Sequence, residues 1–164
     1  MIADPIKLNL ANFADYISVL PIAFYAGSIY ELILSPNNET LKYFLGIFTS
    51  TIASDVIKRL PYPKSLYKMS RRPEGAENCD YLAKTGPAKP NAPGFPSGHM
   101  TTTAFFATYK AMENMENKPL LLLLTGIVVG MSWSRHYKKC HTTTQIIGGI
   151  ILGGVSAVLV KKYV

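Results

Sequence analysis

Gly94-Phe95-Pro96-Ser97-Gly98-His99 brings a tight turn, a hydroxyl group and a histidine to the start of an apolar, helix-like segment. The long segment before this stretch is rich in Lys, Arg and Pro, and a second histidine, His141, lies in a polar segment between two later apolar runs. The sequence therefore predicts that the groups able to do chemistry gather at the ends of apolar helices.

The composition favours a membrane protein. Of the 164 residues, 48% are hydrophobic, and the mean hydropathy of +0.15 is high for a soluble protein of this length. Lys and Arg outnumber Asp and Glu by 17 to 10, giving a formal charge of +7. Such a charge suits nucleic acid, anionic lipid or a phosphorylated substrate, and does not choose among them. The length fits one domain covering residues 1–164.

Several apolar stretches approach the roughly 20 residues that a helix needs to cross a bilayer. The candidate spans are residues 16–34, 41–57, 98–115, 119–133 and 144–160. The last stretch contains four glycines that allow close contact between helices, namely Gly148, Gly149, Gly153 and Gly154. The predicted fold is therefore all-α, a polytopic membrane helix bundle with five candidate spans.

Two further segments flank these spans. Residues 1–14 carry Ile6, Leu10 and Phe13 at helical spacing, which predicts either a short interfacial helix or a partly ordered terminus. Residues 60–95 combine many prolines with many basic residues and are expected to form a long irregular loop. A loop of this length is usually functional or disordered, and the apolar spans on both sides favour a functional loop.

If successive spans cross the membrane in alternating directions, His99, Arg135, His141 and the basic loop lie on the same side of the membrane. A single histidine at a helix end is usually a satisfied interfacial residue, and Ser97 alone is more typical of a helix cap than of a nucleophile. Together, however, these groups supply what phosphoryl transfer needs. Cations and a helix N-terminus hold phosphate oxygens, while the histidines provide a nucleophile and a proton donor.

At these residues the chain resembles the type 2 phosphatidic acid phosphatase superfamily, over about residues 41–161. The family pattern is Lys, six residues, Arg-Pro; then Pro-Ser-Gly-His; then Ser-Arg, five residues, His, three residues, Asp. The chain contains Arg72-Pro73, the complete Pro96-Ser97-Gly98-His99, and Ser134-Arg135 followed after five residues by His141. Three elements in this order, each beside an apolar stretch, form a specific signal.

The resemblance implies a role for each matching residue. His141 would attack phosphorus to form a phosphohistidine, and His99 would protonate the leaving group. The phosphoryl oxygens would be held by Arg72, Arg135, Ser97 and Gly98. The resemblance implies neither a metal nor a cofactor for hydrolysis, because fixed cations stabilise the charge.

The chain departs from the family pattern at two positions. Ser65 stands at the expected lysine spacing, so either Lys58 or Lys64 would supply this cation, and Lys58 is favoured because it ends an apolar stretch. Gln145 stands where the family has Asp. Loss of the carboxylate in Ser-His-Asp sites costs up to about 10^4 in rate. Because the Gln145 carbonyl can still accept from an imidazole N–H, we expect a slowed phosphatase.

The resemblance implies an integral, multi-pass membrane enzyme that hydrolyses a phosphomonoester or pyrophosphate of a lipid, such as phosphatidic acid or an isoprenoid pyrophosphate. Its partners would be that lipid and the bilayer, not nucleic acid, and the sequence indicates no oligomeric state. The alternative is a catalytically impaired membrane protein that binds anionic lipid headgroups. The resemblance places the active site on the extracytoplasmic or lumenal face. The positive-inside tendency argues against this, since only five of the 17 basic residues would lie inside.

Cys79 and Cys140 are the only cysteines, and both would lie on the active-site side. They would pair in an oxidising lumen and so tie the basic loop to the segment of His141. Two unpaired thiols are the simpler expectation.

Overall fold

In the computed structural model, residues 10–79 and 86–164 are described, and they are helical without regular strands. The helices are α1 (Leu10–Leu34), α2 (Asn38–Arg59), α3 (Lys64–Ser70), α4 (Gly98–Glu113), α5 (Lys118–Tyr137) and α6 (Thr143–Tyr163). The all-α prediction is therefore confirmed for the described residues.

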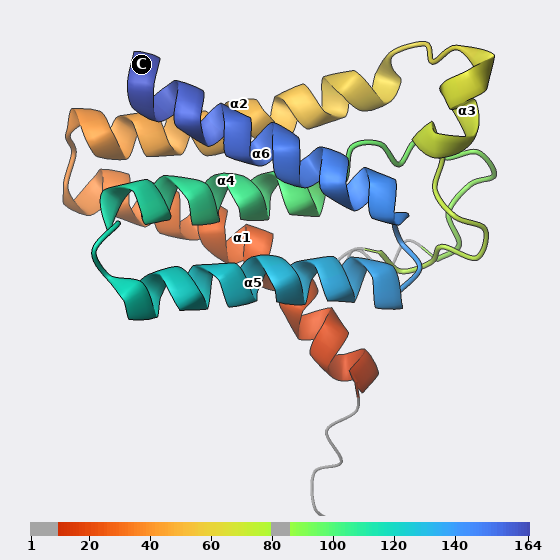
Figure 1. Cartoon of the computed structure of the whole chain (residues 1–164), viewed down its shortest axis with the longest axis horizontal. Helices are drawn as coiled ribbons and strands as arrows, with labels where there is room; N and C mark the ends of the chain where they lie inside the picture. Colours follow the sequence, from red (N-terminus) through yellow and green to blue (C-terminus); the bar gives the residue numbers. More distant parts are fainter. Residues whose placement is uncertain (1–9, 80–85) are drawn as a thin grey trace, which may run out of the picture.

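The five long helices lie side by side, and α3 with the segment leading to α4 covers one end of the bundle (Figure 1). α4 packs against each of the other four long helices. The end of α2, the start of α4, the end of α5 and the start of α6 meet beside the covering loop (Figure 1). The segments predicted to carry the chemistry are thus brought to one end of the molecule.

The five stretches predicted as spans correspond to the five long helices. By length and composition, α1 and α6 are the described helices apolar enough to cross a membrane, with mean hydropathies of 1.7 and 1.8. The number of membrane crossings therefore stays a prediction. Residues 10–14, expected to lie in an interfacial helix or a loose terminus, form the first turns of α1, and residues 1–9 lie outside the described part.

The loop at 60–95 contains α3, a helix that the sequence pattern does not predict. Pro63 occupies its N-cap position, and seven residues form the helix before the chain becomes extended at Arg71. Pro63 suits a helix start because its missing N–H would have no partner there. α3 packs against α6, and this tertiary contact stabilises a helix too short to persist alone.

Close contact between α4 and α6 depends on glycines, as the sequence predicts. A Cβ atom on Gly153 would lie 2.1 Å from the Thr101 carbonyl oxygen, and one on Gly149 would lie 2.6 Å from the Ser97 carbonyl oxygen. This close approach also allows the backbone N–H of Ser97 to donate to the backbone carbonyl of Gln145 at a distance of 3.0 Å. The two helices therefore begin beside each other at the loop end of the bundle.

Ion pairs join the helices at the opposite end. Lys110 of α4 pairs with Glu31 of α1 at 2.7 Å. Lys161 of α6 pairs with Glu39 of α2 and, at 3.4 Å, with Glu113 of α4. Four helices are thus connected by charge at the end remote from the loop.

Candidate active site

A cavity of about 440 Å³ lies where the loop meets the ends of α2 and α4. Its walls come from α1, α2, α4, the loop and the turn before α6. Five of the residues selected from the sequence line it, namely Lys58, Arg72, Gly98, His99 and His141. The structure therefore gathers most of the predicted site around one space.

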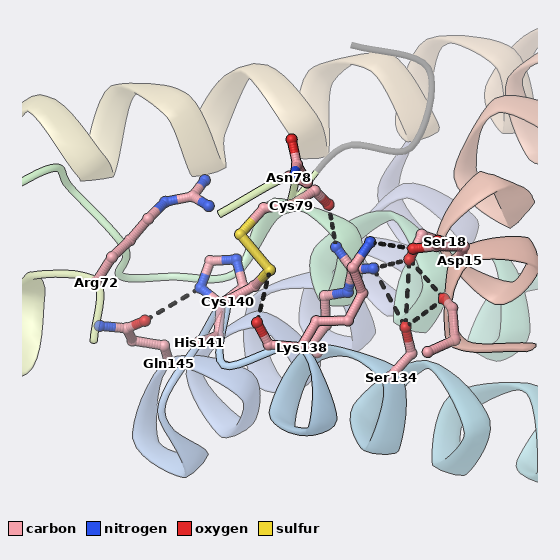
Figure 2. The surroundings of a disulfide bond; sticks show 12 residues. Asp15, Ser18, Arg72, Asn78, Cys79, Ser134, Lys138, Cys140, His141 and Gln145 are labelled. Atoms are coloured by element: carbon pink, nitrogen blue, oxygen red, sulfur yellow. Dashed lines mark hydrogen bonds and ion pairs between the residues drawn. A yellow bond between two sulfur atoms is a disulfide. The ribbon is translucent and has the colours of Figure 1, made fainter. Parts of the chain in front are cut away.

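His141 lies in the turn between α5 and α6, and Gln145 lies one helical turn further along the chain. The Nδ1 atom of His141 is 3.0 Å from the Gln145 Oε1 atom (Figure 2). Because the Gln145 Nε2 group donates elsewhere, Oε1 is the acceptor and Nδ1 carries the hydrogen. The Nε2 atom of His141 is then left with its lone pair, which is the form a nucleophile requires.

Gln145 is fully buried and uses its whole amide. Its Nε2 group donates to the Met69 carbonyl at 2.9 Å and to the Arg71 carbonyl at 2.6 Å. Its Oε1 atom also accepts from the Thr142 N–H at 3.3 Å. A Cβ atom on Gly94 would lie only 2.6 Å from Oε1, so this glycine leaves room for the amide. Gln145 therefore connects the candidate nucleophile to the segment that carries Arg72.

The surroundings of His141 keep its imidazole uncharged. Burial is the largest cause, and the nearby charges of Arg72, Arg135 and Lys58 act in the same direction. The hydrogen bond to Gln145 opposes them, and together these effects lower the pKa of His141 to about 3. The neutral ring is thus the dominant form at ordinary pH.

Lys58, at the end of α2, reaches the start of α4. A Cβ atom on Gly98 would lie 3.0 Å from the Lys58 Nζ atom, which shows how closely the ammonium approaches this helix terminus. Asp55 pairs with Lys58 at 2.7 Å and also lines the cavity. Lys64, the other candidate for the first-motif lysine, lies at the start of α3 and is not among the described residues lining the cavity.

Ser97 holds the N-cap position of α4, but its hydroxyl group makes no capping hydrogen bond. The side chain is fully buried, and Oγ has no hydrogen-bond partner within the described residues. The sequence favours Ser97 as a helix cap, whereas the structure gives it the position without the bond. Ser97 is not among the described residues that line the cavity, so its contact with a phosphate oxygen stays a prediction.

The two arginines differ in position. Arg72 lines the cavity, and its Nε atom donates to the Pro93 carbonyl at 3.4 Å. Arg135 is fully buried at the end of α5 and donates to the Cys79 carbonyl at 2.6 Å and to the Ser18 hydroxyl of α1. It is not among the described residues that line the cavity, although its charge acts on His141.

Cys79 and Cys140 form a disulfide bond, which joins the loop to the residue before His141 (Figure 2). The expectation of two unpaired thiols is therefore wrong. The cysteines are 61 positions apart in the chain, so no local pattern reveals their proximity. The bridge also fixes the Cys79 carbonyl that accepts from Arg135.

A group of three hydroxyls in the cavity wall was not selected from the sequence. Tyr25 of α1 contacts Thr51 of α2 at 2.5 Å and Thr102 of α4 at 3.0 Å. All three residues line the cavity, together with apolar Val19 and Ile22 of α1. The polar threonines within an apolar stretch are the only sequence signal for this group, because Tyr25 resembles any other aromatic residue of α1.

The arrangement has the parts that phosphoryl transfer needs. Lys58, Arg72 and the start of α4 offer positive charge and N–H groups to phosphate oxygens, while His141 offers a lone pair and His99 a second imidazole. Among the described residues, no group of three or more His, Cys, Asp or Glu side chains is arranged to hold a metal ion.

Comparison with known proteins identifies the family of the chain. The chain matches the PAP2 superfamily over residues 39–164 and belongs to that family. The family resemblance seen in the sequence is thus confirmed.

Two relatives are informative. The chain is 26% identical, over 158 residues, to lipid phosphate phosphatase epsilon 2, chloroplastic, of Arabidopsis thaliana. The match covers 92% of the chain and 48% of that protein, so the chain spans about half the length of this relative. The crystal structure of a transmembrane PAP2 type phosphatidylglycerolphosphate phosphatase from Bacillus subtilis has the same fold, with a TM-score of 0.65 at 20% identity. That likeness covers 94% of the chain and 76% of the Bacillus protein.

Proposed function

We propose that the chain is an integral membrane lipid phosphatase, forming one membrane-embedded domain over residues 1–164. It would hydrolyse the phosphomonoester or pyrophosphate of a lipid through a phosphohistidine. The single observation that carries this proposal is the neutral His141, oriented by Gln145, in a cavity that also contains Lys58 and Arg72. The printed names of both relatives, a lipid phosphate phosphatase and a phosphatidylglycerolphosphate phosphatase, support a lipid phosphate as substrate.

In the first step, the Nε2 lone pair of His141 attacks phosphorus and the bond from phosphorus to the lipid oxygen breaks. His99 gives a proton to the departing oxygen. In the second step, water attacks the phosphohistidine, His99 takes a proton from that water, and inorganic phosphate leaves with His141 restored. The first step leaves His99 without a proton and the second step returns it, so the two steps together restore both histidines to their starting states.

The phosphate oxygens would contact Lys58, Arg72, the Ser97 hydroxyl and the N–H groups at the start of α4. The positive charges of Lys58 and Arg72 would balance the negative charge of the transition state without a metal ion. Arg135 would contribute its charge from behind the cavity, since Cys79 and Ser18 hold its guanidinium group. Gln145 would orient His141 without adding negative charge, which supports a slower reaction than a carboxylate at this position provides.

Apolar side chains face outward on α1, α2, α5 and α6. The helix α4 has no exposed large hydrophobic side chain and packs against these four helices, so the bundle would cross the membrane five times. On α6 the exposed apolar side chains recur every four residues, at Ile147, Ile151, Val155 and Leu159, and each is at least half exposed. On α5, Leu122 is 76% exposed. Exposed apolar stripes of this length are unfavourable in water and favourable against lipid chains.

The disulfide supports an active site on the extracytoplasmic or lumenal face. Disulfides persist in oxidising compartments and are rare in the reducing cytosol. Because Cys140 is next to His141, the compartment that preserves the bond is also the one that the cavity faces. The disulfide favours this orientation, whereas the distribution of basic residues favours the opposite one.

The activity test compares phosphate release by the purified wild type and by His141→Ala. The substrates are phosphatidic acid, phosphatidylglycerol phosphate and an isoprenoid pyrophosphate in detergent. We expect release by the wild type and a loss of at least about 10^4 in His141→Ala. Equal rates of phosphate release would rule out phosphatase activity at this site. Lipid binding without turnover in both proteins would favour the catalytically impaired lipid-binding protein.

The orientation test uses introduced cysteines, because the natural pair is bonded. Lys64→Cys lies at the loop end, and Lys118→Cys lies at the start of α5 at the other end. We expect an impermeant maleimide to label Lys64→Cys in intact cells and Lys118→Cys only after permeabilisation. The reverse pattern would place the cavity in the cytosol.

A further inference from the structure

A second groove, of about 920 Å³, adjoins the candidate active site. It is lined by α3, by residues 71–76 and 88–91 of the loop, and by Thr142 at the start of α6. Among the residues described, Arg72 lines both this loop groove and the catalytic cavity, and no other residue does. The loop groove is therefore separate from the cavity but adjoins it through one arginine.

The loop groove carries positive charge that the described part of the chain does not neutralise. Lys68, Arg71 and Lys89 line it, and Glu74 is the acidic residue of the lining. Neither lysine makes a hydrogen bond or ion pair with another described residue. Arg71 contacts an uncharged backbone carbonyl and an aromatic ring. The charge left over is suited to an anion.

Arg71 is held in a fixed orientation before any ligand binds. Its Nη1 atom donates to the Asn91 carbonyl at 2.8 Å, and its guanidinium carbon lies 4.3 Å from the centre of the Tyr67 ring. Its Nε atom is buried and has no hydrogen-bond partner in the described structure. Using Nη1 for Asn91 leaves the Nε and Nη2 edge, whose two parallel donors match the oxygens of a phosphate group. A buried donor without an acceptor is costly, so an acceptor that bonds this edge would stabilise the site.

The loop groove lies beside a short helix with exposed apolar side chains. Leu66 and Met69 of α3 are each 43% exposed, and Lys68 lies between them in the chain. α3 follows directly after the end of α2, where a membrane span is expected to leave the bilayer. Exposed apolar residues next to basic ones are typical of protein surfaces at the level of lipid headgroups.

We propose that the loop groove binds the phosphate of an anionic phospholipid headgroup that is not itself the substrate. A bound headgroup would hold the loop residues next to Arg72, and so would favour binding of the substrate in the adjoining cavity. This effect on hydrolysis rests on the proposed function, whereas headgroup binding does not. A free phosphate ion has the same chemistry as the headgroup, and the experiment distinguishes the two.

The test measures binding of fluorescent phosphatidylglycerol, a phosphodiester without a terminal phosphate, to the purified full chain in a zwitterionic detergent. The variant is Lys68→Ala/Lys89→Ala, which removes both lysines of the groove. The control is Lys64→Ala/Lys118→Ala, which removes the same net charge outside the groove. Fluorescent phosphatidylcholine serves as the lipid without net charge, and millimolar inorganic phosphate in excess serves as the competitor.

We expect the Lys68→Ala/Lys89→Ala variant to bind phosphatidylglycerol at least about tenfold more weakly than the wild type, because each lysine near a membrane surface contributes measurably. The control should bind like the wild type, and phosphatidylcholine should bind poorly. An equal loss in the control would overturn the proposal, because general charge would then explain binding. Displacement of the lipid by inorganic phosphate would assign the groove to the free ion instead.

The outcome is separable from that of the proposed function. The His141→Ala variant should lose turnover and keep binding that depends on Lys68 and Lys89. Absence of phosphatase activity in a wild type that still shows such binding would remove the proposed function and leave the groove. Phosphatase activity without lysine-dependent binding would keep the proposed function and overturn the headgroup site.

Discussion

Gln145 accepts a hydrogen bond from Nδ1 of His141 at 3.0 Å while it donates to the carbonyls of Met69 and Arg71. A carboxylate at this position has no hydrogens for those two carbonyls. The amide therefore orients the candidate nucleophile and also fixes the loop in a way that the Asp of the family pattern does not. The departure from the family is an exchange of negative charge for two additional hydrogen bonds.

Replacement of Gln145 by Glu tests this exchange at constant side-chain length. We expect Gln145→Glu to lower the free energy of unfolding by about 2–4 kcal/mol, because a carboxylate oxygen would face two carbonyl oxygens that lose their donor. Activity should fall with stability, as measured by kcat/KM and thermal unfolding in detergent. Gln145→Asp, which restores the family residue with a shorter side chain, should likewise have lower activity and stability than the wild type. A rise in kcat for either variant would show that the missing charge limits the reaction.

The ionisation of His141 provides a prediction about pH. An unperturbed imidazole titrates near pH 6.5, whereas the folded protein lowers the pKa of His141 to about 3. The ring should remain neutral from pH 8 to about pH 5, as followed by nitrogen NMR of labelled histidine and assigned with His141→Ala. The stability from the neutral ring is complete above pH 6.5 and decreases as the pH falls toward 3. A titration of His141 near pH 6.5 would contradict this environment.

Lys58 and Lys64 form a matched pair for testing the phosphate site. Lys58 lines the cavity, whereas Lys64 lies at the start of α3 outside it. We expect Lys58→Gln to lower kcat/KM by about 10^2–10^3, the usual cost of removing one group that stabilises transition-state charge. Lys64→Gln should retain near wild-type kcat/KM. Loss in Lys64→Gln with retention in Lys58→Gln would exchange their roles.

Reduction of the Cys79–Cys140 bond should loosen the site. The bridge closes a loop of about 60 residues, and its loss is expected to lower the free energy of unfolding by up to about 4 kcal/mol. Thermal inactivation with and without dithiothreitol measures the effect. Cys79→Ser/Cys140→Ser should match the reduced wild type and should not respond to the reductant. A wild type with the same half-life in both conditions would mean that the bond contributes little.

The contact between α4 and α6 can be tested with two glycines in helices. A Cβ atom on Gly153 would lie 2.1 Å from the Thr101 carbonyl oxygen, whereas one on Gly126 of α5 meets no atom within 4 Å. We expect Gly153→Ala to lower the melting temperature by several degrees, because the helices must separate. Gly126→Ala should leave it unchanged or raise it, since alanine favours the helix by about 1 kcal/mol. Equal behaviour of the two variants would show that this contact is not tight.

The helices were predictable because their signals are local. Apolar runs and turn residues locate the five long helices, although α1 begins at Leu10 and not at residue 16. The motif containing Ser97 and His99 occupies consecutive positions. The glycines of α6 also follow a local spacing. Residues of this kind reveal their roles without knowledge of the remainder of the chain.

The contacts that complete the site were not predictable, because they join distant parts of the chain. Gln145 binds carbonyls 74 and 76 positions away, and the disulfide spans 61 positions. The guanidinium group of Arg135 is oriented by hydrogen bonds to Cys79 and Ser18, neither of which belongs to a family motif. The helix α3 depends on packing against α6, so its own seven residues carry too weak a signal.

The loop end of the bundle has an ion pair as well as a disulfide, since Lys138 pairs with Asp15 of α1 at 2.5 Å. At the loop end a covalent bond between Cys79 and Cys140 holds the segments together, whereas at the other end Lys161 joins Glu39 and Glu113 by charge alone. High ionic strength weakens the ion pairs at both ends and leaves the disulfide intact. A thiol reductant should therefore loosen the loop end alone, whereas salt should weaken the contacts between helices at both ends.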